Sequence, residues 1–219
     1  MGRWEPNARG RLAKAALELY SERGYEQTTV AEIARRAGLT ERTFFRHYAD
    51  KREVLFDGSG TLRELFVNAV AGAPESATPI DAVAAGLEAA AGMFADRHAF
   101  ARQRQAVITA NRELQERELI KLATLSADLA EALRARDVPE PAASLAAETG
   151  IAVFKVAFVR WVGAGEPDGS DGSDGADGPD GADEESGGQS DGGRGMAELV
   201  RELLGELRTV TAGTTTSGG

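Results

Sequence analysis

The stretch TVAEIARRAGLTERTFFRHY, residues 29–48, decides how this chain folds at its N-terminal end. Thr29 and Glu32 form a T-x-x-E capping box, a pattern that begins a helix. Gly38 can supply the left-handed backbone that a tight turn requires, and Thr40 then caps a second short helix. Two short helices joined by a turn of three to four residues predict a helix-turn-helix.

The second of these helices has an apolar face and a basic face. Phe44 and Tyr48 are four residues apart and continue the apolar side that Leu39 begins. Arg42 and Arg46 point elsewhere. We therefore expect one face to pack on the first helix and the other to remain free for a partner.

Phe45 indicates what that partner is. An exposed aromatic side chain beside cations has little structural reason, so it favours a binding surface. In a helix-turn-helix the second helix lies in the major groove of DNA. Arg42 could bind guanine there, and Thr43 could bond a base edge or touch a thymine methyl group. The alternative is a solvated surface helix in a generic helical bundle.

The acidic balance of the chain does not argue against DNA. The formal net charge is −10, but residues 1–56 carry 11 Lys and Arg against 8 Asp and Glu. Residues 164–195 carry 10 Asp and Glu and one Arg, so this segment holds most of the negative charge. The charge near residue 45 is therefore positive.

Residues 164–195 are rich in Gly and Asp, with Asp at every third position from Asp168 to Asp183. Collagen would need abundant proline, an EF-hand would need ligands at every second position, and a calcium β-roll would need an apolar residue in each repeat. The segment is predicted to be a disordered, self-repelling linker between the last two helices. A regulatory role for it stays open.

The rest of the sequence predicts helices almost throughout, and no alternating strand pattern of useful length is found. The fold class is all-α, with about nine helices. Gly58 and Gly60 are expected inside the helix that joins the two parts of the chain, as a hinge or a kink. Beyond the helix-turn-helix, the expected helical stretches are residues 51–73, 79–96, 97–136 as two helices, 140–163 and 196–210.

Composition excludes several classes of protein. There are no cysteines, so the chain has no disulfides and no thiolate metal site. His47 and His98 are the only histidines, and no nucleophile–base motif is present, so we expect neither an enzyme nor a metal or cofactor site. No apolar run is long enough for a signal peptide or a membrane span, and a cytoplasmic protein without membrane contact is expected.

Residues 10–55 resemble the DNA-binding domain of the tetracycline-repressor (TetR) family. The resemblance lies in AALELYSERGYEQTTVAEIARRAGLTERTFFRHYADKREVL, and it covers about 45 residues. It implies a homodimer of all-helical subunits. Residues 1–56 would then form a three-helix DNA-binding head, and residues 57–219 a regulatory body with a ligand pocket and a dimer face.

The resemblance also implies roles for individual residues. The family often has Gly where Arg42 stands, Tyr where Phe45 stands and Lys where Glu41 stands, so the bases read here are expected to differ. The contacts to the DNA backbone fall on Thr29, Thr40, His47 and Lys51, and the contacts in the groove fall on Glu41, Arg42, Thr43, Phe45 and Arg46.

The body matches the family only in helix number and length. Dimerisation is expected through residues 140–163 and 196–210, and plain core packing remains the alternative for most apolar side chains. The candidates for a ligand pocket are Phe66, Met93, Phe94, Phe100, Arg104, Val107, Asn111, Phe154, Phe158 and Trp161.

Together these observations predict a ligand-responsive transcriptional repressor. It would bind a palindromic double-stranded DNA operator as a homodimer and respond to a small-molecule effector. Two alternatives stay open: an activator or architectural DNA binder of the same fold, and a small-molecule-binding or enzymatic helical protein with a vestigial head.

Overall fold

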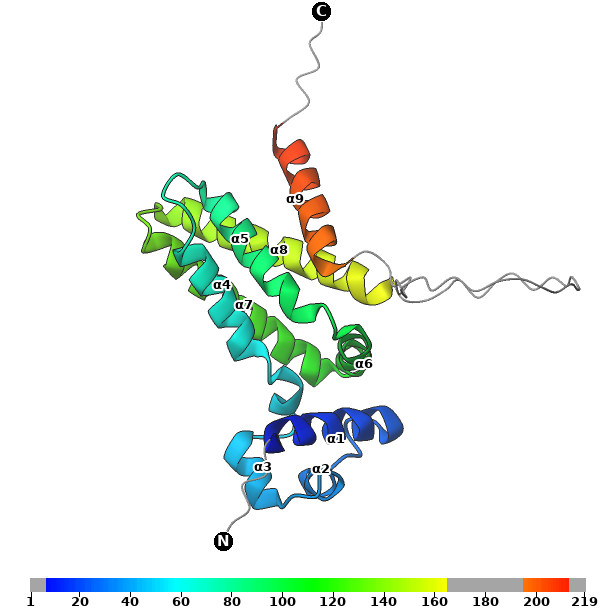
Figure 1. Ribbon diagram of the computed structural model, residues 1–219. Helices are drawn as coiled ribbons and strands as arrows, with labels where there is room; N and C mark the ends of the chain where they lie inside the picture. The colour runs from blue at the N-terminus through cyan, green and yellow to red at the C-terminus, as the bar shows by residue number, and fades with distance from the viewer. Residues whose placement is uncertain (1–6, 165–194, 213–219) are drawn as a thin grey trace, which may run out of the picture.

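The computed structural model describes residues 7–164 and 195–212, and every regular element in this part of the chain is helical (Figure 1). The head contains α1 (Ala8–Arg23), α2 (Val30–Arg36), α3 (Glu41–His47) and the 3₁₀ turn η1 (Glu53–Phe56). The body contains α4 (Ser59–Ala71), α5 (Pro79–Ala91), the 3₁₀ turn η2 (Gly92–Phe94), α6 (His98–Thr109), α7 (Arg112–Arg134), α8 (Glu140–Gly163) and α9 (Met196–Ala212). The all-α fold with nine α-helices is confirmed for the described residues. Nearly all of the predicted linker, residues 165–194, lies outside them.

The helix-turn-helix forms as its capping residues predict. Thr29 Oγ1 accepts from the backbone N–H of Glu32, and the Glu32 carboxylate accepts from that of Thr29 at 2.9 Å. Gly38 has a φ of +66°, and the next N–H, that of Leu39, donates to Ala34 at 2.8 Å. The capping box fixes where α2 begins, and Gly38 fixes the turn that directs α3 away from it.

The two faces of α3 are separated by the packing of the head. Phe44 is fully buried among the apolar side chains of α1 and α2, while its neighbour Phe45 is 55% exposed. The two rings meet edge to face with centroids 5.5 Å apart. The division of roles predicted for the two phenylalanines, one in the core and one outside it, is confirmed.

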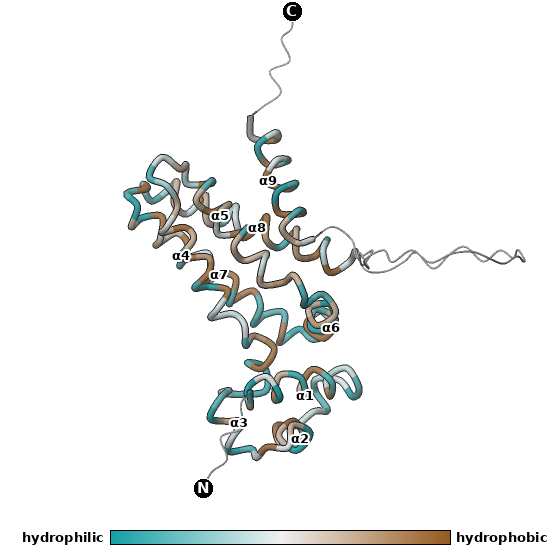
Figure 2. Tube along the Cα trace, in the orientation of Figure 1, coloured by the Kyte–Doolittle hydropathy of each residue, from teal (hydrophilic) through white to brown (hydrophobic). Residues whose placement is uncertain are grey.

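The body is a bundle in which α4 and α5 pack on α7 and α8, and α9 lies across α8 and α5 (Figure 1). Its apolar core runs along α5 and α8, whose hydrophobic stretches are visible in Figure 2. α5 begins at Thr78, whose hydroxyl accepts from the N–H of Asp81, with Pro79 in its first turn. The short α6 connects η2 to α7 and lies between the bundle and the head (Figure 1).

The continuous helix expected over residues 51–73 is wrong. The chain forms the turn η1, and α4 begins only at Ser59, with Gly58 as its N-cap rather than inside a helix. Three consecutive residues of η1, Val54, Leu55 and Phe56, are all buried. One face of a surface α-helix cannot bury three residues in a row, whereas a tight turn between head and body can. The stretch 79–96 is likewise divided, between α5 and η2.

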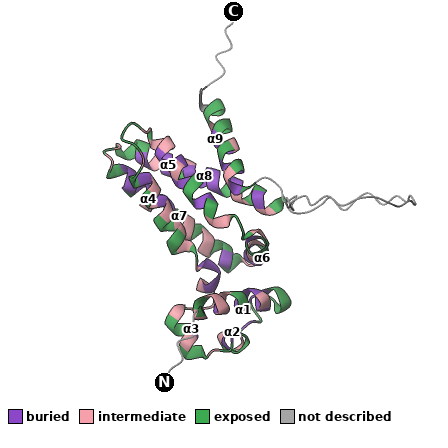
Figure 3. Ribbon diagram, viewed as in Figure 1, coloured by how far each residue is buried: buried purple, intermediate pink, exposed green. Residues whose placement is uncertain are grey.

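α8 is long and apolar enough to cross a membrane by length and composition alone, with a mean hydropathy of 1.6 over an 18-residue window. Its buried residues contact α5, α7 and α9, so the helix forms the centre of the bundle (Figure 3). A core helix of a protein folded in water meets the same criterion. The packing therefore accounts for the apolar residues on the buried face of α8.

Candidate nucleic-acid interface

The outer surface of α3 carries two arginines with no partner in the protein. Glu41, Arg42, Phe45 and Arg46 are all exposed there. Neither Arg42 nor Arg46 makes an ion pair or side-chain hydrogen bond with any residue that the structure describes. Both guanidinium groups are therefore available to an acceptor outside the described chain.

The two threonines at the helix starts are partly engaged. Thr40 Oγ1 accepts from the N–H of Thr43 at 3.2 Å and lies 3.1 Å from the Thr43 hydroxyl. The Thr29 hydroxyl donates to Glu32 at 2.9 Å. Both threonines are exposed, so their oxygens can still accept contacts. Thr43 is half-buried, and its hydroxyl is shared with the cap.

One of the two ring nitrogens of His47 is buried and cannot make an external contact. Its ring is partly buried, and its Nε2 atom is fully buried without a hydrogen-bond partner among the described residues. Nε2 therefore cannot reach DNA unless the ring turns. A contact from His47 to a phosphate or base has to involve its other nitrogen.

Lys51 is placed differently from our expectation of a free phosphate ligand. Its Nζ donates to the backbone carbonyls of Tyr25 at 2.9 Å and Thr28 at 3.1 Å, with a longer contact to Glu26 at 3.4 Å. The ammonium group also lies 4.2 Å from the centre of the Tyr25 ring. Lys51 thus fixes the loop between α1 and α2, and its three donors are already used.

Replacing Lys51 by methionine is expected to destabilise the head. Three carbonyls lose a charged donor, and a hydrogen bond to a charged group contributes roughly 1.5–3 kcal/mol before solvent compensates part of it. We expect a lower thermal unfolding temperature, measured by circular dichroism. Lys14→Met is the control, because the Lys14 side chain is 81% exposed. Unchanged stability combined with a flatter salt dependence of DNA binding would instead assign Lys51 to phosphate.

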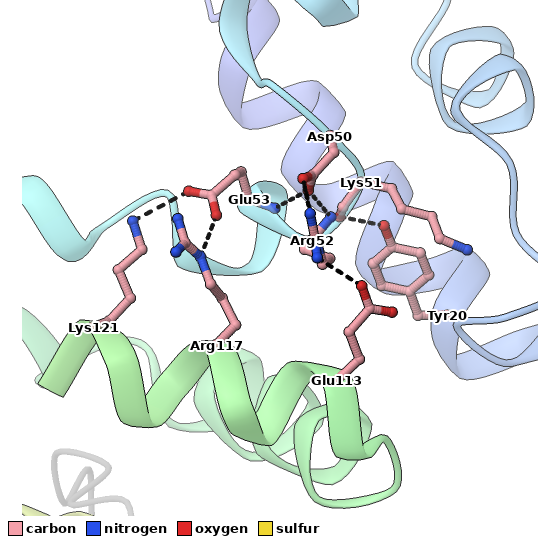
Figure 4. A network of polar contacts seen from close by, with 8 residues as sticks. All are labelled: Tyr20, Asp50, Lys51, Arg52, Glu53, Glu113, Arg117 and Lys121. Carbon is pink, nitrogen blue, oxygen red and sulfur yellow. Dashed lines mark hydrogen bonds and ion pairs between the residues drawn. The ribbon is translucent and has the colours of Figure 1, made fainter. Parts of the chain in front are cut away.

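Asp50 and Glu53 have the D-x-x-E spacing of a capping pair, but only one of the two contacts of such a pair forms. Asp50 accepts from the N–H groups of Arg52 at 2.8 Å and Glu53 at 3.2 Å, as a cap should. The Glu53 carboxylate does not accept from the backbone N–H of Asp50, as the second contact of a capping box would require. It instead binds Arg117 at 2.6 Å and Lys121 at 3.2 Å on α7 (Figure 4). Glu53 therefore joins the head to the body.

A second ion pair strengthens this junction. Arg52 bridges Asp50 at 2.6 Å and Glu113 of α7 at 2.8 Å (Figure 4). Burial raises the pKa of Glu53, but its hydrogen bonds from Arg117 and Lys121 outweigh burial and lower it overall. A carboxylate with a lowered pKa stabilises the fold above its unfolded pKa and loses that effect as the pH falls. The junction is thus held by charges that persist at neutral pH.

Head and body also share apolar packing. Val107 and Ile108 of α6 and Leu114 of α7 belong to the same buried cluster as the core of the head. Arg104 of α6 donates from Nε to the Leu55 carbonyl of η1 at 2.6 Å. The division at residues 56 and 57 is therefore crossed by several contacts, so a movement in the body can reach α1 and η1.

A cavity of about 460 Å³ lies directly behind η1. It is bounded by η1, α4, η2, α6, α7 and α8, so one wall belongs to the head–body junction. Six of the ten predicted pocket residues line it: Met93, Phe94, Phe100, Arg104, Phe154 and Phe158.

The other four predicted pocket residues lie elsewhere. Phe66 is fully buried in the core of the body, and Trp161 packs against His98, whose Nε2 lies 2.9 Å from the Trp161 carbonyl. Val107 belongs to the head cluster. Asn111 precedes α7, and its amide donates to the Val107 carbonyl at 2.6 Å. Phe66 and Trp161 pack against the lining residues Phe154 and Phe94, whereas Val107 and Asn111 lie at the junction with the head.

Sequence reasoning missed the lining from η1 and α7. Residues 54–60 and 118–125 contribute much of the wall. Helical periodicity shows which side of a helix is apolar, but it does not show whether that side meets another side chain or an empty space. Among the described residues no group of three or more His, Cys, Asp or Glu could hold a metal ion.

The described chain thus combines a helix-turn-helix head with an all-helical body that holds a cavity next to η1. Residues 12–57 match the family model described as bacterial regulatory proteins, tetR family. The match is confined to the head of the chain. It is 38% identical over 88 residues to the HTH-type transcriptional regulator TcmR of Streptomyces glaucescens, a match that spans 40% of this chain and 39% of that protein.

Solved structures share the fold of the described chain. A putative transcriptional regulator of Pseudomonas aeruginosa PAO1 has a TM-score of 0.58 at 16% identity, over 96% of this chain and 94% of that one. The transcriptional regulator FadR of Bacillus subtilis, solved with stearoyl-CoA, has a TM-score of 0.53 at 20% identity, over 90% and 96% of the two chains. At these identities the likeness concerns the fold alone.

Proposed function

We propose that this protein is a ligand-responsive repressor that binds a palindromic operator as a homodimer. The observation that carries the proposal is the pair Arg42 and Arg46 on the exposed face of α3, unpaired within the described chain. The core fixes α3 through Phe44, so the two guanidinium groups are held on a rigid element. Such groups can read guanine in the major groove, with Phe45 packed on sugar or thymine methyl beside them.

A dimer is supported by an apolar stripe on α8. Leu145, Ala152, Val156 and Val159 are exposed, and their spacings of seven, four and three residues place them on one face. The opposite face of α8 is buried in the bundle. A long helix buried on one side and apolar on the other is suited to pack against a second copy, and α9 beside it would extend the same surface.

Ligand response is supported by the position of the cavity. It touches η1, and η1 joins the head to the body. A molecule that fits the cavity better in one arrangement of the head would shift the protein toward that arrangement. In a dimer the two heads must meet major grooves about 34–36 Å apart, so a small rotation of each head is enough to release DNA.

A gel-shift assay with the DNA upstream of the protein's own gene tests the proposal. We expect one specific shifted band, and light scattering should give the mass of a dimer on its own. The variant Val156→Asp with Val159→Asp should be monomeric and should lose the shift. A monomeric wild-type protein, or no shift on any fragment from its own genomic region, would contradict the proposal.

A further inference from the structure

The cavity wall is positive although the chain is strongly acidic. Five cationic side chains line it against three carboxylates. Each of the three carboxylates already has a cation: Asp57 binds Arg9, Glu118 binds Arg104 and Asp128 binds Arg63. Of the remaining cations of the wall, Lys121 binds Glu53, whereas Arg97 and Lys155 make no ion pair within the described residues. The wall therefore has positive charge in excess, which favours an anion inside it.

Arg104 is the most enclosed of these cations. Its side chain is 18% exposed and lies over the ring of Phe56, 5.0 Å from the ring centre. Nε donates to the Leu55 carbonyl and Nη1 to Glu118 at 3.2 Å, whereas Nη2 has no hydrogen-bond partner among the described residues. Burial lowers the pKa of Arg104 and Glu118 offsets this only in part, so its charge is incompletely compensated.

The far wall of the cavity is apolar and aromatic. Phe154 and Phe158 of α8 stack with ring centres 6.0 Å apart, and Phe94 of η2 lies 5.6 Å from Phe158. Met93 and Phe100 complete this side. A ligand that satisfies both walls must have an apolar body and a charged end.

We propose that the cavity binds small molecules composed of an apolar body and one carboxylate, with the carboxylate on the Arg104 guanidinium and the body against Phe94, Phe154 and Phe158. The proposal rests on the proposed function in that it names the ligand class of the same cavity. A carboxylate is planar and accepts two hydrogen bonds, which matches the free Nη2 and its neighbour on Arg104. Because the same guanidinium holds the Leu55 carbonyl, the ligand would act directly on η1.

Binding of two matched pairs of probes tests this without DNA. Decanoate and decan-1-ol share a chain, while 2-naphthoate and 2-naphthamide share a ring system, and each pair differs at the anionic group. By calorimetry we expect at least one carboxylate to bind about tenfold tighter than its neutral partner, because charge-assisted hydrogen bonds are the stronger ones. The pair that binds tells whether the ligand body is a chain or a ring.

Variants locate the carboxylate. Arg104→Met should remove the preference for the anion while the neutral probe binds as before, which also shows that the cavity is intact. Arg97→Met and Lys155→Met, at exposed cations of the same wall, should weaken the preference much less than Arg104→Met does. Glu118→Gln frees Arg104 from its carboxylate and should tighten anion binding several-fold, so the test does not depend on Arg104→Met folding.

The outcomes separate this inference from the proposed function. Equal binding of anion and neutral partner, no binding of any probe, or a preference that is lost in Lys155→Met but kept in Arg104→Met would overturn the ligand class. None of these results affects the interpretation of the gel-shift assay, because that assay is performed without ligand. Conversely, a missing gel shift together with an intact preference for the anion would contradict the proposed repressor function but would support the proposed carboxylate site.

Discussion

Arg42→Ala combined with Arg46→Ala is expected to abolish specific operator binding while leaving the protein folded. Both side chains are exposed and neither has a partner in the described chain, so their removal costs no internal contact. A well-placed arginine–guanine pair contributes about 1–3 kcal/mol of discrimination against a wrong base. Loss of two such contacts corresponds to a roughly 30-fold or greater drop in affinity for the operator.

Fluorescence anisotropy with labelled operator and with a scrambled duplex measures the effect. The double variant should bind both duplexes with the same weak affinity, because the remaining contacts go to the DNA backbone. Arg112→Ala is the matched control: it removes an exposed arginine whose ion-pair partner in the described chain is Glu116 on α7. An undiminished preference for the operator in the double variant would show that α3 does not read the bases.

The single variants separate the two roles. Arg42 stands in the first turn of α3, nearest the expected groove floor, and Arg46 is one turn further on. Arg42→Ala should relax selectivity at one base pair. Arg46→Ala should do the same if Arg46 reads a base, and should weaken all sequences alike if it meets a phosphate. The salt dependence of binding distinguishes these cases for Arg46.

The head could be predicted because its structure is encoded by neighbouring residues. The cap at Thr29 and Glu32 and the left-handed Gly38 act over three to five positions, and the structure contains each of them. Phe44 and Phe45 were separated by the helical period alone. For a short helix, the sequence can thus predict which side chains face the core and which face outward.

Contacts between distant segments could not be predicted in this way. Lys51 has the charge of a phosphate ligand, but only the folded loop at Tyr25 reveals three carbonyls within its reach. Glu53 has the spacing of a capping residue, yet Arg117 lies 64 positions away and binds it instead. A side chain can have one possible partner nearby in the sequence and another on a distant segment. In such a case the sequence pattern predicts only the nearby partner.

Gly150→Ala is expected to destabilise the body strongly, although alanine favours a helix. A Cβ atom at this position of α8 would lie 2.2 Å from Cγ1 of Val83 on α5, closer than atoms can approach. Val83 is fully buried and its β-branched side chain has few rotamers to choose from. The helices must therefore separate, and overpacking of a core costs about 1–3 kcal/mol or more.

Three further variants make this prediction specific. Val83→Ala removes the blocking methyl group, so Gly150→Ala combined with Val83→Ala should be more stable than the sum of the single effects allows. Gly205→Ala is the control, because nothing lies within 4 Å of its Cβ position on α9. There the helix preference of alanine acts alone and should raise stability by up to about 1 kcal/mol. Urea unfolding followed by circular dichroism measures all four proteins.

The Gly150→Ala substitution is expected to affect the shape of the cavity as well as the stability of the body. Phe154 follows Gly150 by one helical turn, faces the same core and contacts Phe66 of α4 with ring centres 5.8 Å apart. Moving α8 away from α5 would displace Phe154 from its place in the cavity wall. Gly150→Ala should therefore weaken binding of the apolar probes as well as the fold, whereas Gly205→Ala should change neither. Equal stability of Gly150→Ala and wild type would mean that α5 and α8 do not pack as closely as the contact with Val83 requires.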